Sequence, residues 1–206
     1  MRPLIAMVLA MATIGLVSAC NPEDTPLQRS TALAGDPACQ VGVIGDSLTV
    51  GARDLGGLVG RFGSVGCAVV NVDARVGRPA AEGASIAEAW AAWGVMPRVL
   101  VVAVGTNDCS RGPMASAVRR VLDAAGPDRP VVWVNTWRRG CDGPVNGALL
   151  DAQAALGARP DSGNLWIVDH WSAVRADPGL LARDGVHLSA AGYRAHADRI
   201  VRAVVG

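Results

Sequence analysis

Three side chains in this sequence have the types and the local context of a nucleophile, its base and the acid that orients the base. Ser47 comes just after an apolar run that ends at Gly45, and the glycine gives the backbone the freedom for a sharp turn. A serine hydroxyl is a weak nucleophile until a base takes its proton. His187 lies three residues after Asp184, so the carboxylate can hold one imidazole nitrogen while the other accepts the proton of Ser47. The pattern predicts attack of a serine hydroxyl on an acyl carbon.

The two other histidines are weaker candidates for the base. His170 follows the last apolar run and is the only competitor, whereas His196 lies inside the final amphipathic segment, where we expect a surface or packing residue. No second cluster of histidines or cysteines near Asp184 and His187 completes a metal-ligand set. The sequence therefore predicts a site without metal or cofactor.

Attack on a carbonyl creates an oxyanion, which needs hydrogen-bond donors already in place. The candidates are the backbone amides of Ser47 and Gly77 and the side-chain amide of Asn107, each of which follows a different apolar run. Gly77 has no side chain to prevent a close approach of the substrate. Gly83 lies close by and is the alternative glycine.

The hydrophobic pattern predicts a scaffold that brings these distant residues together. Short runs rich in valine and isoleucine alternate with alanine-rich amphipathic segments, which is typical of a parallel sheet covered by helices on both faces. We expect one α/β domain, a three-layer sandwich with five strands. The expected strands are 40–45, 68–73, 98–104, 130–135 and 165–169, and the expected helices are 48–59, 80–93, 113–125, 145–156 and 189–204. The candidate residues then follow the carboxyl ends of strands, where ligands bind in such sheets.

Four short blocks together resemble the SGNH/GDSL hydrolase superfamily. They are Gly45-Asp46-Ser47-Leu48, Gly77, Gly105-Thr106-Asn107-Asp108 and Asp184 to His187, and they come in the family's order over residues 39–206. The resemblance implies a flavodoxin-like α/β/α sandwich with strand order 2-1-3-4-5. It also implies metal-free ester hydrolysis by a Ser47, His187 and Asp184 triad. Residues 73–79 are similar to a short actinobacterial type, found in extracytoplasmic domains that are fused to membrane acyltransferases and modify cell-envelope glycans.

These features predict a serine esterase that hydrolyses short-chain esters, acetyl esters above all, through an acyl-Ser47 intermediate, on a small ester or an acylated cell-envelope glycan. No long insertion between the blocks could form a lid, so we expect a shallow, open site. One alternative is O-acyl transfer to cell-wall carbohydrate, and another is a glycan-binding module without turnover. We expect a monomer.

Further residues after the strand ends are candidates for substrate contact. Trp137 and Trp171 could line an acyl or sugar subsite or could simply pack. The arginines at the same strand ends could meet the substrate or carry ordinary surface charge: Arg78, Arg138 and Arg139. The remaining tryptophans considered are expected to pack in the core or between helices: Trp133 and Trp166 within strands, and Trp90 and Trp93 three residues apart on a helix.

The first residues of the chain have the pattern of an export signal. An uncharged apolar run from Pro3 to Ala19 precedes Cys20, and Val17-Ser18-Ala19-Cys20 resembles a bacterial lipobox. We therefore expect a lipoprotein signal peptide at 1–19, a lipid on Cys20, a flexible tether at 20–38 and a domain held outside the cytoplasm at the membrane. An uncleaved membrane helix and ordinary secretion are the alternatives. The chain carries 19 basic and 18 acidic residues, a balance that gives no indication of nucleic-acid binding.

The four remaining cysteines are expected to form two disulfides, because an exported domain is oxidised. In the strand order that the resemblance implies, Cys39 and Cys67 precede neighbouring strands, and Cys109 and Cys141 follow neighbouring strands. Adjacent strands lie about 4.8 Å apart, within reach of a disulfide. The sequence thus predicts the pairs Cys39–Cys67 and Cys109–Cys141.

Overall fold

The computed structural model describes residues 39–157 and 164–206. The expected signal peptide 1–19, the tether 20–38 and the lipid attachment at Cys20 lie outside these residues. Within them, no helix is both long enough and apolar enough to cross a membrane. The expected hydrolase domain, 39–206, is thus described apart from residues 158–163.

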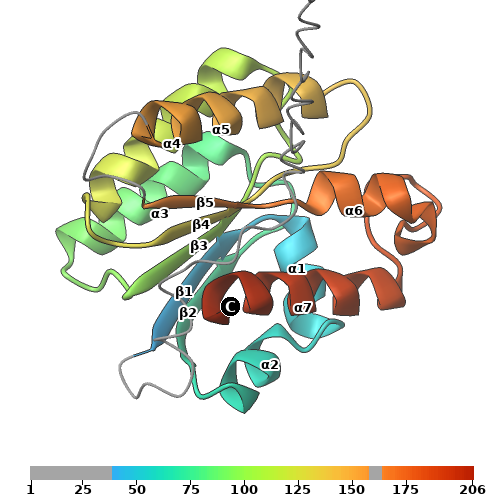
Figure 1. Ribbon diagram of the computed structural model, residues 1–206, viewed down its shortest axis with the longest axis horizontal. Helices are drawn as coiled ribbons and strands as arrows, with labels where there is room; N and C mark the ends of the chain where they lie inside the picture. Colours follow the sequence, from blue (N-terminus) through green and yellow to red (C-terminus); the bar gives the residue numbers. More distant parts are fainter. Residues whose placement is uncertain (1–38, 158–163) are drawn as a thin grey trace, which may run out of the picture.

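Five parallel strands form one sheet in the order β2-β1-β3-β4-β5, which confirms the order that the family resemblance implied (Figure 1). Every strand begins and ends within one residue of its predicted bounds. Inner strands β3 and β4 are buried along their whole length, because helices cover both faces of the sheet. The strands are β1 Gln40–Gly45, β2 Ala68–Ala74, β3 Val99–Ala103, β4 Val131–Val134 and β5 Leu165–Val168.

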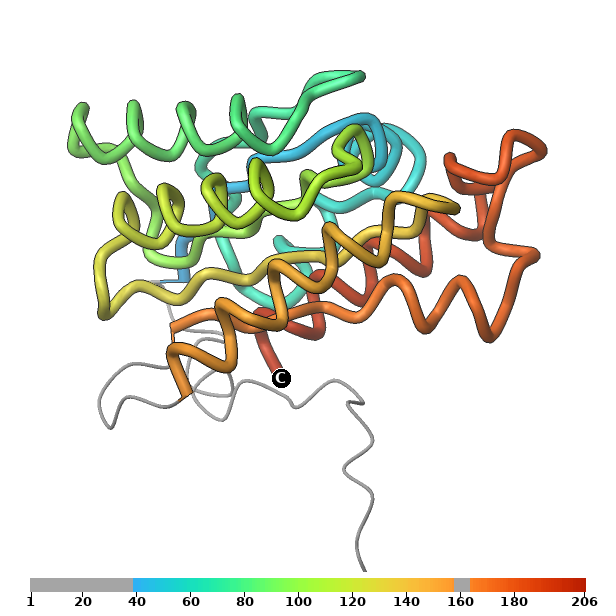
Figure 2. Tube along the Cα trace, turned by 90° about the horizontal axis from the view of Figure 1, so that it is seen from above, coloured from blue at the N-terminus to red at the C-terminus, as the bar shows by residue number. Residues whose placement is uncertain are grey.

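Helices cover the sheet in two layers (Figure 1). On one face lie α3 Ala80–Ala92, α4 Arg111–Ala125 and α5 Asp142–Gly157, and Figure 2 shows these three side by side. On the other face lie α1 Ser47–Asp54, α2 Leu58–Ser64 and α7 Ala190–Val205. Alternate strand residues pack into each layer: Val102 and Trp133 against α3, α4 and α5, and Val101 and Val132 against α2 and α7. The three-layer α/β/α sandwich is therefore confirmed.

The single helix expected at 48–59 is wrong, because the chain turns between α1 and α2. Gly57 has φ +68°, a left-handed conformation that favours glycine. A Cβ atom at Gly56 would lie 2.5 Å from the carbonyl oxygen of Tyr193, so α7 packs directly on this turn. The two glycines thus end one helix and let the next begin.

A further helix, α6 His170–Ala176, follows β5 and was not expected. Its seven residues are too few to show a helical hydrophobic period. The local signal is Asp169, whose carboxylate caps the helix by accepting a hydrogen bond from the Ser172 amide at 3.0 Å. A short 3-10 turn, η2 Pro178–Leu180, leads from α6 back towards α7.

Both predicted disulfides are present. Cys39 and Cys67 join the starts of β1 and β2, with 4.8 Å between their Cα atoms. Cys109 and Cys141 join the loops after β3 and β4, with Cα atoms 4.2 Å apart. One disulfide therefore lies at each end of the sheet.

Candidate active site

The three residues predicted as a triad lie in one hydrogen-bonded row. His187 Nε2 is 3.0 Å from Ser47 Oγ, and His187 Nδ1 is 2.6 Å from Asp184 Oδ2. This arrangement lets the imidazole accept the hydroxyl proton while the carboxylate stabilises the imidazolium that results. The row joins the start of α1 to the loop before α7, so residues 140 positions apart meet at one edge of the sheet.

The carboxylate of Asp184 is fixed in place although it is exposed. Its Oδ1 accepts hydrogen bonds from the backbone amides of Val186 at 3.0 Å and His187 at 2.9 Å, while Oδ2 faces the imidazole. The hydrogen bond with the His187 side chain, helped by the two backbone amides, lowers the pKa of Asp184 to about 2. Asp184 is therefore ionised at neutral pH, and its loop supports a fixed geometry.

Local packing at the end of β1 positions Ser47. A Cβ atom at Gly45 would lie 1.9 Å from Thr49 Oγ1, so any side chain there would displace the first turn of α1. Asp46 caps this helix, because its Oδ1 accepts a hydrogen bond from the Leu48 amide at 2.9 Å. Burial raises the pKa of Asp46 to about 6. Hydrogen bonds from Leu48 and Thr106 act in the opposite direction, but their effect is smaller. Ser47 is thus the first residue of a helix whose start is held by a buried carboxyl group.

The three predicted oxyanion donors lie on three neighbouring loops. Neither the Ser47 amide nor the Gly77 amide donates a hydrogen bond to another described residue. Gly77 has φ +75°, and a Cβ atom built on it would meet no atom within 4 Å, so the side of the backbone on which a side chain would stand is open. Asn107 uses one N–H of its side-chain amide to donate to the Arg78 carbonyl oxygen at 3.1 Å, which leaves the second N–H for a ligand. The three groups can therefore act as oxyanion donors.

Arg78 does not face the substrate, which corrects the expectation for this residue. Its side chain is only 5% exposed. The guanidinium donates to the Gly45 carbonyl oxygen at 3.0 Å, to both the backbone and the side chain of Asp73, and to Glu82. Neither the expected substrate contact nor ordinary surface charge describes Arg78, because a buried charged residue needs partners. Here several acceptors from β1, β2 and α3 surround it, so it anchors the Gly77 loop to the strand that leads to Ser47.

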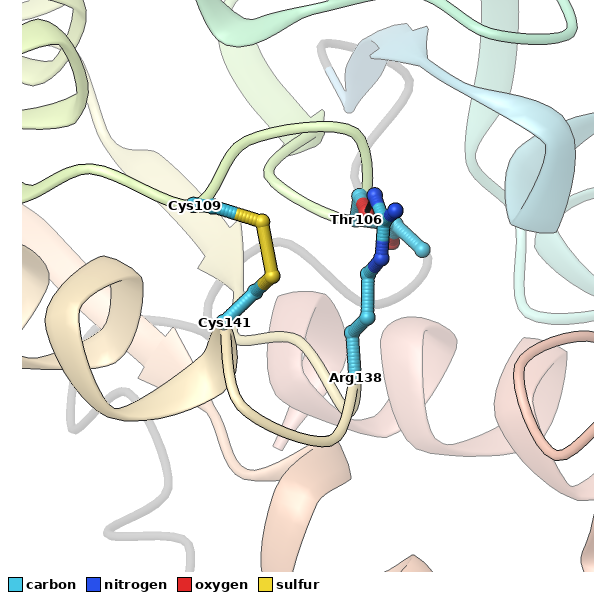
Figure 3. The surroundings of a disulfide bond; sticks show 4 residues. All are labelled: Thr106, Cys109, Arg138 and Cys141. Atoms are coloured by element: carbon cyan, nitrogen blue, oxygen red, sulfur yellow. Dashed lines mark hydrogen bonds between the residues drawn. A yellow bond between two sulfur atoms is a disulfide. The ribbon is translucent and has the colours of Figure 1, made fainter.

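A covalent bond and several hydrogen bonds hold the loop that carries Asn107. The disulfide Cys109–Cys141 joins it to the loop after β4, and Arg138 donates to the Thr106 carbonyl oxygen at 2.7 Å (Figure 3). The hydroxyls of Thr106 and Thr136 are 2.9 Å apart and reinforce the same junction. Arg138 is half-buried, and this contact places it as a brace between the two loops.

Asp108 joins the Asn107 loop to α3. Its Oδ2 accepts a hydrogen bond from the Ala80 amide at 2.8 Å. Burial raises the pKa of the Asp108 carboxyl group, while the Ala80 amide and the charge of Arg138 act in the opposite direction. The loop is therefore held on both sides, by α3 and by the loop after β4.

His170 is excluded as the base by its position. It is 1% exposed, and its Nδ1 lies 3.2 Å from Nδ1 of His196, which is also 1% exposed. Burial lowers the pKa of His170 to about 3 and that of His196 well below its usual 6.5. Both rings are thus neutral packing residues, which confirms the packing interpretation of His196. Among the described residues, no group of three His, Cys, Asp or Glu side chains could hold a metal ion.

A family model described as the GDSL-like lipase/acylhydrolase family matches residues 43–195. This chain belongs to that family. The matched segment contains every candidate for the triad and the oxyanion hole: Ser47, Gly77, Asn107, Asp184 and His187. Among proteins of curated function, none matches the sequence significantly.

Solved structures share the fold of this GDSL-like chain. The C-terminal catalytic domain of peptidoglycan O-acetyltransferase A from Streptococcus pneumoniae is 18% identical over 80% of this chain and 92% of that one, with a TM-score of 0.64. A family 3 carbohydrate esterase from Clostridium thermocellum is 16% identical over 82% and 99%, with a TM-score of 0.62. A lipolytic protein of the G-D-S-L family from Veillonella parvula is 20% identical over 78% and 94%, also with a TM-score of 0.62. At these low sequence identities, the similarity shows a shared fold and nothing beyond it.

Tryptophans form one wall beside the site of this GDSL-like domain. Trp137 packs on an apolar cluster that includes Leu48 and Leu188, the residues that follow Ser47 and His187. Trp171 lies next to it, with ring centroids 6.4 Å apart. Trp133 is fully buried and Trp90 nearly so, as expected.

Two tryptophans are not packed as expected. Trp166 is only partly buried, because β5 is an edge strand. Trp93 is 72% exposed; it is the C-cap residue that follows α3, and only its backbone amide bonds back to the helix.

The sequence reasoning missed the supporting residues of the GDSL-like site. Asp46 and Asp108 each accept a hydrogen bond from a backbone amide at the start of a helix. An aspartate directly before a helix is a recognised capping signal, so Asp46 could have been found. Asp108 caps a helix that is distant in the chain, and no local sequence pattern predicts such a contact.

Proposed function

We propose that this protein is a serine esterase that hydrolyses short acyl esters, acetyl esters above all, through an acyl-Ser47 intermediate. We further propose that its substrates are acylated glycans of the cell envelope. The observation that carries the proposal is the row from Ser47 Oγ through His187 to Asp184, with distances of 3.0 and 2.6 Å. The family match is consistent with it.

In the first half of the reaction, Ser47 Oγ attacks the carbonyl carbon and His187 Nε2 takes its proton. The carbonyl electron pair moves to oxygen, where the amides of Ser47 and Gly77 and the side chain of Asn107 donate hydrogen bonds. The oxyanion then collapses, the ester C–O bond breaks, and the departing alkoxide takes the proton from His187. An alcohol leaves, and the acyl group stays on Ser47.

In the second half, water attacks the acyl carbon while His187 Nε2 takes a proton from it. Collapse of the second oxyanion breaks the bond to Ser47 Oγ, and His187 returns the proton to this oxygen. The free acid leaves, and the enzyme is regenerated. Asp184 stays ionised throughout, since its pKa is about 2, and it stabilises the imidazolium at each stage.

Exposure of the site supports short acyl groups as substrates. The side chain of His187 is 43% exposed and that of Asp184 is 52% exposed. A long acyl chain binds through burial of apolar surface, at about 0.8 kcal/mol for each CH2 group. An open surface offers little such burial, so long acyl chains gain little binding free energy here. An acetyl group, which has no CH2 group to bury, is therefore the best suited to this site.

Replacement of Ser47 tests the proposal. We expect Ser47→Ala to lower turnover of 4-nitrophenyl acetate by about 10⁴-fold or more. Ser64→Ala, which changes an exposed serine on α2, should have wild-type activity. A fluorophosphonate should label the wild-type chain at residue 47 alone. Undiminished turnover by the Ser47→Ala protein would refute the function.

Acyl transfer to a sugar hydroxyl is the second candidate. An open site can admit an acceptor alcohol in place of water, and the Streptococcus pneumoniae structure named above is a peptidoglycan O-acetyltransferase domain. The test is product analysis with an acetyl donor and an oligosaccharide acceptor. Release of acetate alone at high acceptor concentration would exclude transfer.

We also propose that the domain works outside the cytoplasm, anchored by a lipid on Cys20. The two disulfides support an oxidising compartment. Replacement of Cys20 by alanine should move the protein from the membrane fraction to the soluble fraction. An unchanged distribution would argue against lipid anchoring.

A further inference from the structure

A second concavity lies along the edge strand β5, outside the triad and the oxyanion loops. Its volume is about 590 Å³, within the roughly 300–1,000 Å³ that is usual for ligand sites. We call it the β5 groove. It is lined by residues of β5, of α5 and of the start of α6, among them Asp142, Asn146, Leu150, Trp166, Asp169 and Trp171.

The groove combines aromatic surface with hydrogen-bond acceptors. Trp166 and Trp171 are both only partly buried. Asp142 uses one carboxylate oxygen to accept from the Trp171 indole, and Asp169 uses one to accept from Asn135 and Ser172. The second oxygen of each carboxylate makes no hydrogen bond to another described residue, so it is free to accept one from a ligand.

Three contacts hold Trp171, which lines the groove, in place. Its backbone amide donates to Asn135 Oδ1 at 2.8 Å, and its indole N–H donates to Asp142. The guanidinium carbon of Arg175 lies 4.5 Å from the centroid of its ring, a cation–π contact. A side chain fixed by three contacts loses little entropy when a ligand packs on it.

Two tryptophans lie between the groove and the candidate active site. Trp171 lines the groove, and its ring centroid lies 6.4 Å from that of Trp137. Trp137 in turn packs on the cluster that contains Leu48 and Leu188, next to Ser47 and His187. A polymer with its ester at Ser47 can therefore extend over this aromatic pair into the groove.

The chemistry of the groove selects one class of ligand. The described lining residues include two carboxylates and no arginine, which disfavours an anionic polymer. Sugar rings have apolar C–H faces that pack on indole rings and hydroxyls that donate to carboxylates. We propose that the β5 groove binds the neutral sugar chain of an acylated glycan, at a distance from the ester that reacts. This proposal rests on the esterase function proposed above, and it assigns that enzyme a polymeric substrate.

Binding can be tested without turnover. The full-length Ser47→Ala chain, labelled with 15N, is titrated with unacetylated xylopentaose and with chitopentaose, and the indole N–H signals are followed by NMR. We expect the signals of Trp166 and Trp171 to shift with at least one of the sugars, with a Kd on the order of 1 mM. Exposed Trp93 and buried Trp133 serve as controls and should not shift.

Kinetics supply an independent test. Trp166→Ala should lower kcat/KM for an acetylated pentasaccharide about tenfold and leave 4-nitrophenyl acetate turnover unchanged. Leu150→Glu adds a charge at a 57% exposed helix position, so it should fold normally and have the same selective effect. Trp93→Ala is the matched control and should affect neither substrate.

The outcomes separate the groove from the esterase. The proposal of sugar binding in the groove is overturned if neither Trp166 nor Trp171 shifts with either sugar. It is also overturned if both groove variants lose equal activity on the two substrates. Full activity of Ser47→Ala would overturn the esterase and leave the NMR result standing, because that titration measures binding alone. Shifts that also include Trp93 would identify non-specific binding and would count against the groove.

Discussion

The carbonyl oxygen of Arg78 accepts a hydrogen bond from the side-chain amide of Asn107 at 3.1 Å, so one proposed oxyanion donor holds the loop that carries another. Arg78 is anchored to the Gly45 carbonyl oxygen, just before the third donor at Ser47. The oxyanion hole is therefore a set of linked loops, and a change in one of them should alter the positions of the others.

Replacement of Asn107 should show this linkage. Asn107→Ala removes one donor and frees the Gly77 loop, so we expect kcat to fall about 100- to 1,000-fold with little change in KM. Steady-state kinetics on 4-nitrophenyl acetate measure the effect, with Arg119→Ala at an exposed position on α4 as the control. A higher KM with unchanged kcat would mean that Asn107 binds the ground state instead.

Asp184→Asn should retain the fold and lose activity. The side chain is 52% exposed, so its replacement costs little stability. An amide cannot stabilise the imidazolium of His187, and turnover should fall about 10⁴-fold. Circular dichroism and kinetics check the two statements. The pKa of Asp184 is about 2, so its titration produces no step in the pH–rate profile above pH 4. The profile of the Asp184→Asn variant should therefore lack no step that the wild-type profile has above pH 4.

Arg78→Met should reduce stability and activity together. The substitution leaves Asp73 and Glu82 without their buried cation, which should cost about 2–3 kcal/mol of unfolding free energy. Loss of the loop anchor should lower turnover of acetyl and butyryl esters by equal factors. Urea unfolding and a chain-length series measure both effects. Unchanged stability with selective loss on one ester would restore Arg78 as a substrate contact.

The two disulfides allow a matched comparison. They close loops with sequence separations of 28 and 32, so loss of either should cost a similar unfolding free energy, about 3–4 kcal/mol. Only the pair Cys109–Cys141 lies beside Asn107, so its double serine variant should lose about 10- to 100-fold in turnover below the melting temperature. The Cys39→Ser, Cys67→Ser protein is the control. Equal activities of the two variants would contradict the bracing role.

The buried histidines should make the fold sensitive to acid. Their pKa values are lowered in the folded state, so the unfolded chain takes up more protons below pH 6.5 and stability falls as the pH falls. Each histidine contributes up to about 1.4 kcal/mol per pH unit. The double variant His170→Leu, His196→Leu should flatten the dependence of Tm on pH between 6.5 and 5.

Asp46 acts with the opposite sign. Its pKa rises from 3.8 to about 6 on folding, so its contribution to stability falls as the pH rises through that window. Asp46→Asn removes this term and should steepen the acid loss of Tm, in contrast to the histidine variant. An unchanged slope in both variants would show that other groups control acid unfolding.

The sequence predicted the elements and residues that follow from pattern and chemistry. Valine-rich runs fixed the strands within one residue, because a parallel sheet buried on both faces leaves a continuous apolar signal. The row from Ser47 to Asp184 was predicted because the chemistry requires those three groups. Both disulfide pairs were predicted from neighbouring strands, in the strand order that the family resemblance implied.

What the sequence did not predict depends on contacts between distant segments. The turn at Gly57 and the helix α6 are short, and a hydrophobic period needs more residues to be visible. Burial of Arg78 depends on acceptors from three elements, and the half-open position of Trp166 depends on β5 being an edge strand. Such environments exist only after the chain has folded.

Asp184 and His187 belong to one short loop, tied by two backbone amides and one side-chain contact. The relative position of carboxylate and imidazole therefore depends on contacts within four residues. Only the separation of the imidazole from Ser47 depends on how distant parts of the chain pack together.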